Sequence, residues 1–401
     1  MRTAPLGLIA LFLGAAAGCG KGGGTAGGQP LGRVVCWGLG QSGQIGDGQL
    51  QQADRPTSTA PITGDIAGLF AKGSTSCARL AAGGFACWGD RAGGLFGPSP
   101  GDSSRPTPVT IVPDAVELAM GSLHACARRP SGEVLCWGAN LVGQLGNGQA
   151  PDPKTKVAIK VGDKGAEPVQ PLPAGAGSDK PVAVTGLTDA VEIAAGRSHT
   201  CARRRDGGVV CWGQNTLGQL GDGNQAPNAS SDRPVAVADL TDATAIFAGG
   251  NAACALRAKG GLWCWGSLSD MYPSDGARPI ITPRPAEVPG LQDAVEVALS
   301  EEKAGACARR ASGAVLCWTA GKEPQAIDGL AQAKQVVAGM GHFCALLSSG
   351  EVTCWGDDFA GALGIPSTER KGDKQPIPGL DKVVELAAGS RHTCARRSEG
   401  Q

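Results

Sequence analysis

Several residue types that build catalytic or nucleic-acid-binding surfaces are scarce in this 401-residue sequence. It has one tyrosine, four histidines and an aromatic content of 4%, and its 36 basic residues balance 36 acidic ones. Nucleic-acid binding normally needs a basic surface, with aromatic side chains for unpaired bases. The composition therefore argues against a nucleic-acid partner. It also supplies few aromatic anchors for an interface that covers an enzyme's active site.

Catalytic signatures are missing as well. The sequence contains no GxSxG, HExxH, phosphate-binding P-loop or EF-hand pattern. The stretch from Gly38 to Gly43 matches GxGxxG, but no helical pattern follows it, so we do not interpret it as a dinucleotide site. We expect a protein that is not an enzyme and that holds neither a cofactor nor a metal ion.

Cysteine and glycine are abundant, with 15 and 64 residues, and they recur with a fixed period. Six cysteine pairs are each ten residues apart: Cys77 and Cys87, Cys126 and Cys136, Cys201 and Cys211, Cys254 and Cys264, Cys307 and Cys317, and Cys344 and Cys354. A glycine follows the midpoint of every pair, at Gly83, Gly132, Gly207, Gly260, Gly313 and Gly350. A three-residue hairpin loop favours glycine at its last, left-handed position. Each pair is therefore predicted to face across a β-hairpin, with Cα atoms roughly 4.5 to 5.5 Å apart, within disulfide reach.

Two further cysteines, Cys36 and Cys394, are predicted to pair with each other. Cys394 opens a unit that stops at Gln401, and Cys36 closes a unit whose first strand is missing. Joining the two ends restores the ten-residue spacing and makes a seventh hairpin. The sequence thus predicts a closed ring of seven repeats. Seven disulfides imply an oxidising compartment, and the wide spacing disfavours zinc.

Residues 1–18 have the pattern of an export signal, with Arg2, an apolar stretch from Leu6 to Leu13 and small residues before Cys19. This pattern resembles a bacterial lipoprotein signal, in which Cys19 would be lipidated. An ordinary cleavage site followed by an unpaired thiol is the alternative. No later stretch approaches the roughly 20 apolar residues of a membrane-spanning helix. Residues 19–30, the lipidated cysteine and a glycine-rich stretch, are predicted to tether the domain.

Residues 31–401 are predicted to form one all-β domain. Each unit carries an alternating apolar strand such as the one from Asp189 to Gly196, suited to a crowded axis. Proline-bearing connectors such as Asp232 to Val237 suit edge strands. The insertion at about 150–180 is rich in Pro, Gly, Lys and Asp, and it is a candidate contact element because loops on rigid scaffolds often bind partners.

Units reading G-x-x-H-x-C-A, G-x-V-x-C-W-G and GQLG(D/N)G resemble the regulator of chromosome condensation repeat over nearly the whole mature chain. The resemblance implies a seven-bladed β-propeller of four-stranded blades, sealed by joining N- and C-terminal strands in one blade. After Trp265 and Trp318 the GQLG tail is replaced, which predicts altered outer loops there.

The four histidines stand two residues before the first cysteine of a unit, at His124, His199, His342 and His392. Such a ring position could converge on a metal, but a role in blade packing is far commoner, and we favour it. The tryptophans that follow the second cysteines are predicted to be core between blades.

One repeated surface feature is a candidate binding band, made of the two arginines after Cys-Ala: Arg128, Arg129, Arg203, Arg204, Arg309, Arg310, Arg396 and Arg397. The favoured alternative is local pairing with a glutamate that recurs upstream: Glu117, Glu192, Glu296 and Glu385. If these arginines bind, an anionic protein or envelope polysaccharide is the expected partner.

The sequence therefore predicts a monomeric, lipid-anchored, extracytoplasmic propeller at the outer membrane or cell surface, which binds another protein or a glycan. Two alternatives follow from the resemblance. One is an enzyme inhibitor of the β-lactamase inhibitory type, and the other is a guanine-nucleotide exchange regulator, whose usual partner export would remove.

Overall fold

The computed structural model describes residues 33–90, 103–109, 111–150, 159–162, 165–168, 176–224, 226, 229–269, 279–301, 305–372 and 374–398, with the backbone alone at 159–162 and 165–168. The chain divides into two units, Met1–Pro30 and Leu31–Gln401. The predicted signal, Cys19 and the tether lie outside the described residues. No helix in the described part is long and apolar enough to cross a membrane.

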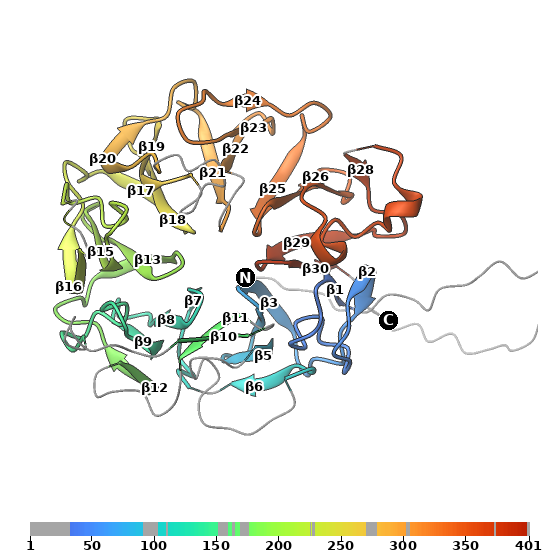
Figure 1. The fold of residues 1–401 in the computed structure, drawn as a ribbon, viewed down its shortest axis with the longest axis horizontal. Coiled ribbons are helices and arrows are strands. Elements are labelled where there is room, and N and C mark those ends of the chain that lie inside the picture. Colours follow the sequence, from blue (N-terminus) through green and yellow to red (C-terminus); the bar gives the residue numbers. More distant parts are fainter. Residues whose placement is uncertain are drawn as a thin grey trace, which may run out of the picture. The chain divides into compact units, whose positions relative to one another are not determined.

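The second unit is a ring of seven four-stranded antiparallel sheets, which confirms the predicted propeller (Figure 1). We number the blades from the one that contains both chain ends. The innermost strands of blades 1 to 7 are β29 (Val383–Ala388), β3 (Ile66–Lys72), β7 (Glu117–Met120), β13 (Ala190–Ala195), β17 (Ala243–Gly249), β21 (Ala294–Leu299) and β25 (Ala333–Ala338).

The second and third strands of each blade form the predicted hairpins. The second strands are β30 (His392–Arg397), β4 (Thr75–Leu80), β8 (His124–Arg128), β14 (His199–Arg204), β18 (Asn251–Arg257), β22 (Ala306–Arg310) and β26 (His342–Leu347). The third strands are β1 (Val34–Gly38), β5 (Phe85–Gly89), β9 (Val134–Ala139), β15 (Val209–Gln214), β19 (Leu262–Ser267), β23 (Val315–Trp318) and β27 (Val352–Gly356).

The outer strands are β2 (Ala53–Ser58), β6 (Thr107–Val109), β12 (Gly177–Ala183), β16 (Ser230–Ala236), β20 (Thr282–Glu287), β24 (Gln325–Ala326) and β28 (Gln375–Pro376). Six of the seven outer strands contain proline, as predicted for edges, and β24 is the exception. Two short 3₁₀ helices, η2 (Phe359–Gly361) and η3 (Ser367–Glu369), belong to blade 7. Within the insertion, β10 (Ile159–Gly162) pairs with β11 (Gly165–Pro168) in a separate two-stranded sheet, and its side chains lie outside the described residues.

Disulfides join all seven predicted cysteine pairs, one in each blade. In blades 2 to 7 the bonds are Cys77–Cys87, Cys126–Cys136, Cys201–Cys211, Cys254–Cys264, Cys307–Cys317 and Cys344–Cys354. In blade 1, Cys36–Cys394 links the first strand of the chain to the last. In each of these blades the bond joins the second strand to the third, and the third strand supplies Cys136, Cys317 and Cys354.

The bridged cysteines lie closer together than the sequence analysis expected. In blade 4, Cys201 faces Cys211 and the hairpin turns at Gly207 with φ of 85°. The Cα atoms of the bridged pairs are 4.0 to 4.1 Å apart, below the expected range of roughly 4.5 to 5.5 Å. A covalent bond between directly facing residues draws the two strands together.

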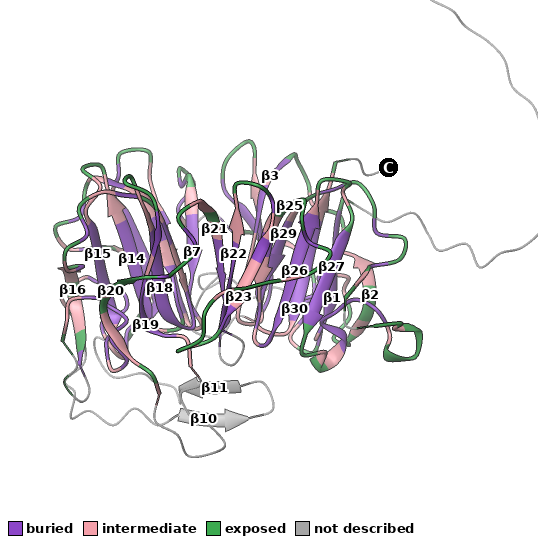
Figure 2. Ribbon diagram, turned by 90° about the horizontal axis from the view of Figure 1, so that it is seen from above, coloured by how far each residue is buried: buried purple, intermediate pink, exposed green. Residues whose placement is uncertain are grey.

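The core lies between blades, because each sheet buries both faces against its neighbours. Figure 2 shows buried strands with exposed residues concentrated in the loops at the two ends. Trp37, Trp88, Trp212 and Trp265 are among the largest fully buried side chains, which confirms their predicted place. The innermost strands surround a central channel with a volume of about 320 Å³.

Candidate functional site

The first arginine of each candidate pair lies against the glutamate of its own innermost strand. The N–O distances are 2.6 Å for Arg128–Glu117, 2.8 Å for Arg203–Glu192, 2.9 Å for Arg309–Glu296 and 2.7 Å for Arg396–Glu385. Arginine and glutamate face each other across the strand pair, as Arg203 and Glu192 do. The predicted local pairing is therefore confirmed.

These glutamates also join neighbouring blades. The backbone N–H of Ile193 in blade 4 donates to Glu117 of blade 3 at 3.3 Å, and that of Leu69 in blade 2 donates to Glu385 of blade 1 at 3.1 Å. Burial raises the pKa of Glu117, although Arg128 acts in the opposite direction. Glu117 thus holds two blades together, and its arginine compensates its buried charge.

The second arginine of each pair contacts the aspartate at the start of the innermost-strand motif. The pairs are Arg129–Asp114 at 3.1 Å, Arg204–Asp189 at 3.0 Å, Arg310–Asp293 at 2.7 Å, and Arg397–Asp381. The side chains of Arg204 and Arg310 remain 40% and 39% exposed. The candidate band is thus a ring of arginine–carboxylate pairs, and a binding role for it stays a prediction.

Exposed valines lie beside this ring, which the sequence analysis did not identify. Val116, Val295 and Val384 are 39%, 40% and 44% exposed. Val295 and Val384 occupy β-bulges, since the pairing register shifts between Ala294 and Glu296 and between Val383 and Glu385. A bulge turns a side chain away from the pleat, so these valines face solvent instead of the blade core.

The four histidines are buried between blades. In three of them Nε2 lies within hydrogen-bond distance of a hydroxyl in the next blade: 2.8 Å for His124–Thr200, 2.9 Å for His342–Thr393 and 2.7 Å for His392–Ser76. In blade 5 the corresponding sequence position is Ala253, so among the described residues His199 has no such hydroxyl partner. Burial lowers the pKa of His124 and His342 to about 4 and that of His199 and His392 to about 3. These positions make the histidines packing residues, as favoured from the sequence.

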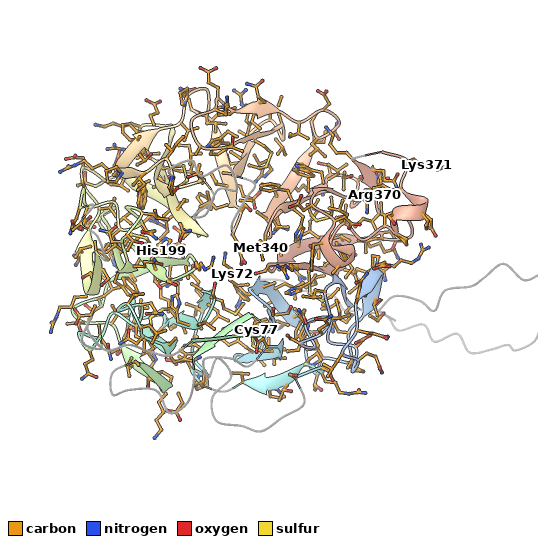
Figure 3. All side chains as sticks on the ribbon, viewed as in Figure 1. Lys72, Cys77, His199, Met340, Arg370 and Lys371 are labelled. Atoms are coloured by element: carbon orange, nitrogen blue, oxygen red, sulfur yellow. A yellow bond between two sulfur atoms is a disulfide. The ribbon has the colours of Figure 1, made fainter. Side chains whose placement is uncertain are left out.

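An ion pair lies at one end of the channel. Lys72 at the end of β3 in blade 2 lies 3.3 Å from Glu301, which follows β21 in blade 6. Ser390 and the backbone N–H of Gly73 also donate to the Glu301 carboxylate. Burial opposes ionisation of Glu301, but Lys72 and these donors together hold its pKa below the usual value. Figure 3 shows Lys72 and Met340 near the centre of the ring.

The GQLG-type loops cover the tryptophan of the next blade. The indole N–H of Trp265 in blade 5 donates to the carbonyl of Gln219 in blade 4 at 2.9 Å, and Leu220 is buried beside it. Gly221 has φ of 67°, and an added Cβ would lie 2.8 Å from the Trp265 ring. Equivalent bonds join Trp88 to Gln44, Trp212 to Gln144 and Trp37 to Ala362.

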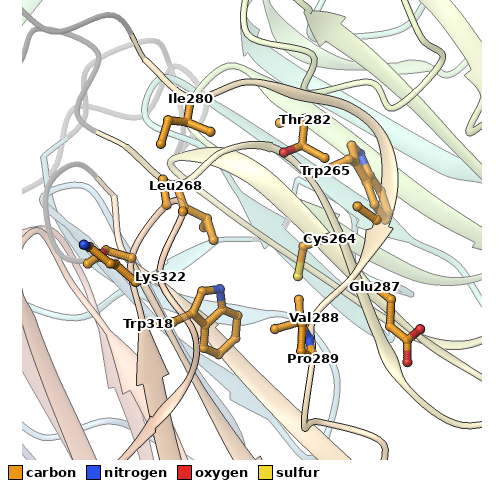
Figure 4. A pocket seen from close by; sticks show the side chains of 15 residues that line it. Cys264, Trp265, Leu268, Ile280, Thr282, Glu287, Val288, Pro289, Trp318 and Lys322 are labelled. Carbon is orange, nitrogen blue, oxygen red and sulfur yellow. The ribbon is translucent and has the colours of Figure 1, made fainter.

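Where this loop is replaced, a pocket opens between blades 5 and 6 (Figure 4). Its volume is about 180 Å³, and Trp318, Leu268 and Val288 supply much of its apolar wall. Glu287 and Lys322 also line it. Within the described residues, no carbonyl accepts a hydrogen bond from the Trp318 indole N–H. The altered loop was predicted from the sequence, and the pocket was not.

The fold and the bridged hairpins define the class of protein, a closed seven-bladed β-propeller with one disulfide per blade. Profiles described as Regulator of chromosome condensation (RCC1) repeat match residues 115–144, 190–219 and 333–362, and residues 131–203 and 206–256. The matched blades of this propeller are therefore RCC1 repeats.

Sequence and structure comparisons also find similar proteins. The chain is 26% identical over 208 residues to the human "Probable E3 ubiquitin-protein ligase HERC6", a match covering 51% of this chain and only 17% of that protein. Human WBSCR16 superposes with a TM-score of 0.73 at 18% identity, covering 92% of this chain and 99% of the other. Prp20p from Saccharomyces cerevisiae, described with its binding properties to Gsp1p and histones, gives 0.72 at 19% identity, covering 92% and 91%. At these identities the structural similarity shows the fold alone.

Proposed function

We propose that this chain is an extracytoplasmic binding scaffold, anchored through a lipid on Cys19 at the outer membrane or cell surface and without catalytic activity of its own. The RCC1-like propeller fold is a protein-binding scaffold, and the seven disulfides favour an oxidising compartment. A protein is the partner that the surface supports best.

One observation carries this proposal, namely the exposed valines beside the arginine–aspartate pairs. Three blades have an exposed valine at the equivalent place, namely Val116, Val295 and Val384. Each valine stands two residues before a strand residue that lines the channel. Exposed apolar side chains with a charged rim are typical of protein interfaces. We call Val116, Val295 and Val384 with Arg129, Arg204 and Arg310 the valine–arginine face.

Affinity capture from native envelope extracts tests the scaffold role. The parent chain is expected to retain a partner that a Val116→Asp, Val295→Asp variant loses, whereas Leu50→Asp retains it. Leu50 is 61% exposed and lies outside the valine–arginine face, so it controls for added surface charge. Protease treatment of the extract should abolish capture. Persistence after protease would favour a polysaccharide, and equal capture by all variants would remove this face from the proposal.

The anchor is tested separately by Cys19→Ser. The parent is expected in the membrane fraction with incorporated radiolabelled palmitate, and the variant without label. An unlabelled parent would contradict the lipid anchor and leave the binding role standing.

A further inference from the structure

We propose that the pocket between blades 5 and 6 binds a loop of a protein partner in which an aliphatic side chain is flanked by glycine. This inference rests on the proposed scaffold function and names a second contact for it. The argument starts from four contacts inside the propeller. The tryptophans of blades 1, 2, 4 and 5 each bind a loop from the preceding blade in which an aliphatic residue is followed by glycine.

The intramolecular complexes define the occupant's chemistry. Each loop places a buried aliphatic side chain in the interblade core, at Ile45, Leu145, Leu220 or Leu363. Each also presents the preceding residue's carbonyl to an indole N–H, at 2.9 to 3.0 Å. The following glycine lies so close to the indole that a Cβ there would be 2.8 to 2.9 Å from a ring atom. An aliphatic residue, a free carbonyl and a glycine are therefore recognised together.

The pocket over Trp318 resembles these receptors, and among the residues that the structure describes no equivalent aliphatic side chain, carbonyl or glycine covers the ring. Trp318 supplies a buried ring and an N–H that no described residue accepts. Its volume of about 180 Å³ is close to the roughly 150 Å³ cavity that takes a benzene-sized apolar ligand. Ile280 lines the same pocket and is 51% exposed, so part of its apolar surface faces solvent.

A loop of this type can be supplied as a short peptide because it stabilises its own conformation. In blade 4 the N–H of Leu217 donates to Gln219 Oε1 at 2.8 Å, and the N–H of Leu220 donates to Asn215 Oδ1 at 2.9 Å. Asn215 also donates to Asp222 at 3.0 Å. All these bonds lie within residues 213–223, so part of the ordering is local to the segment.

The test titrates a peptide with the sequence of residues 213–223, GQNTLGQLGDG, into the full disulfide-bonded chain. The readout is the indole ¹H–¹⁵N spectrum, with the Trp318 signal assigned by its loss in Trp318→Phe. Saturable binding is expected to shift the Trp318 signal. Trp318→Phe should weaken the affinity about threefold to tenfold, since it removes one hydrogen bond and keeps most of the ring.

Ile280→Arg should weaken binding at least fivefold, whereas Leu50→Arg, its matched control at another exposed apolar position, should not. A peptide carrying Asp in place of its second leucine should not bind. The proposal is overturned by an absence of saturable binding or by affinity that Ile280→Arg leaves unchanged. A further variant replaces residues 270–278 by glycine and serine. If the peptide binds only to that variant, the occupant of the pocket is this chain's own segment and the proposal is overturned. None of these results depends on the valine–arginine face, so failure here leaves the capture experiment intact.

Discussion

Lys72 Nζ lies 3.3 Å from Glu301 Oε1, although the two residues belong to blades 2 and 6, which are not neighbours in the ring. Their side chains are only 12% and 9% exposed. Both charges are thus removed from water at one end of the channel, and each compensates the other.

Glu301→Gln should destabilise the chain by about 3 kcal/mol, because the Lys72 ammonium would stay buried without its counter-charge. The amide keeps most of the shape and can still accept from Ser390. Chemical denaturation at neutral pH measures the loss. The double variant Lys72→Met, Glu301→Gln should recover much of it. A single variant within about 0.5 kcal/mol of the parent, on the scale of an ordinary surface substitution, would contradict the assignment.

Mild acid should destabilise the protein through its histidines. Their folded pKa values, about 3 to about 4, lie below the unfolded value near 6.5. The neutral histidines therefore contribute full stability above pH 6.5, and this is lost progressively as pH falls toward 4, by up to about 1.4 kcal/mol per pH unit for each residue.

Denaturation midpoints between pH 6.5 and 5 test this through His124→Asn. The slope of the unfolding free energy against pH reports how many protons the chain takes up on unfolding. In the His124→Asn variant this number should be smaller than in the parent by about one. The raised pKa of Glu117 acts with the opposite sign, but it is present in both proteins and largely cancels in the comparison. Identical slopes would show that His124 is not a buried neutral group.

Ala253→Thr should stabilise the protein by about 1 kcal/mol. The new hydroxyl would face His199 Nε2, as Thr200 faces His124. Ala306→Thr is the matched control. Ala306 is the equivalent residue of blade 6, and the preceding blade has Ala252 at the histidine position, so the new hydroxyl at residue 306 would be buried without a ring nitrogen to bind. The control should lose stability in thermal unfolding. Equal shifts in both variants would contradict a specific hydrogen bond.

Removing the Cys36–Cys394 bridge should lower stability more than removing Cys254–Cys264. The bridged residues are separated by 358 and 10 positions respectively. Loop-closure entropy gives about 6 and about 3 kcal/mol as upper values. Paired Cys→Ser variants, compared by thermal unfolding under identical conditions, measure the difference. Equal losses would mean that blade 1 closes without help from its bridge.

The hairpins and their disulfides were predictable because they are local. Ten-residue spacing and a glycine such as Gly207 specify the facing register within one strand pair. The arginine–glutamate pairs depend on a second register, that of the innermost strand against the second strand, in which Glu192 faces Arg203. The sequence held only a weak signal for the hydroxyl partners of the histidines. Thr200 and Thr393 each come directly after the histidine of their own unit, and each binds the histidine of the preceding unit. That signal becomes readable only once the direction of packing between blades is known.

By itself the sequence determined the repeat, the number of blades, the bridged hairpins and the joining of the two chain ends in one blade. Each of these depends on residue spacing within a strand pair or on a count. Only the tertiary structure decided that Lys72 meets Glu301, that Val116, Val295 and Val384 face solvent, and that a pocket lies over Trp318. These features depend on the curvature of the closed ring and on which surfaces neighbouring blades leave uncovered, and neither is specified by spacing along the chain.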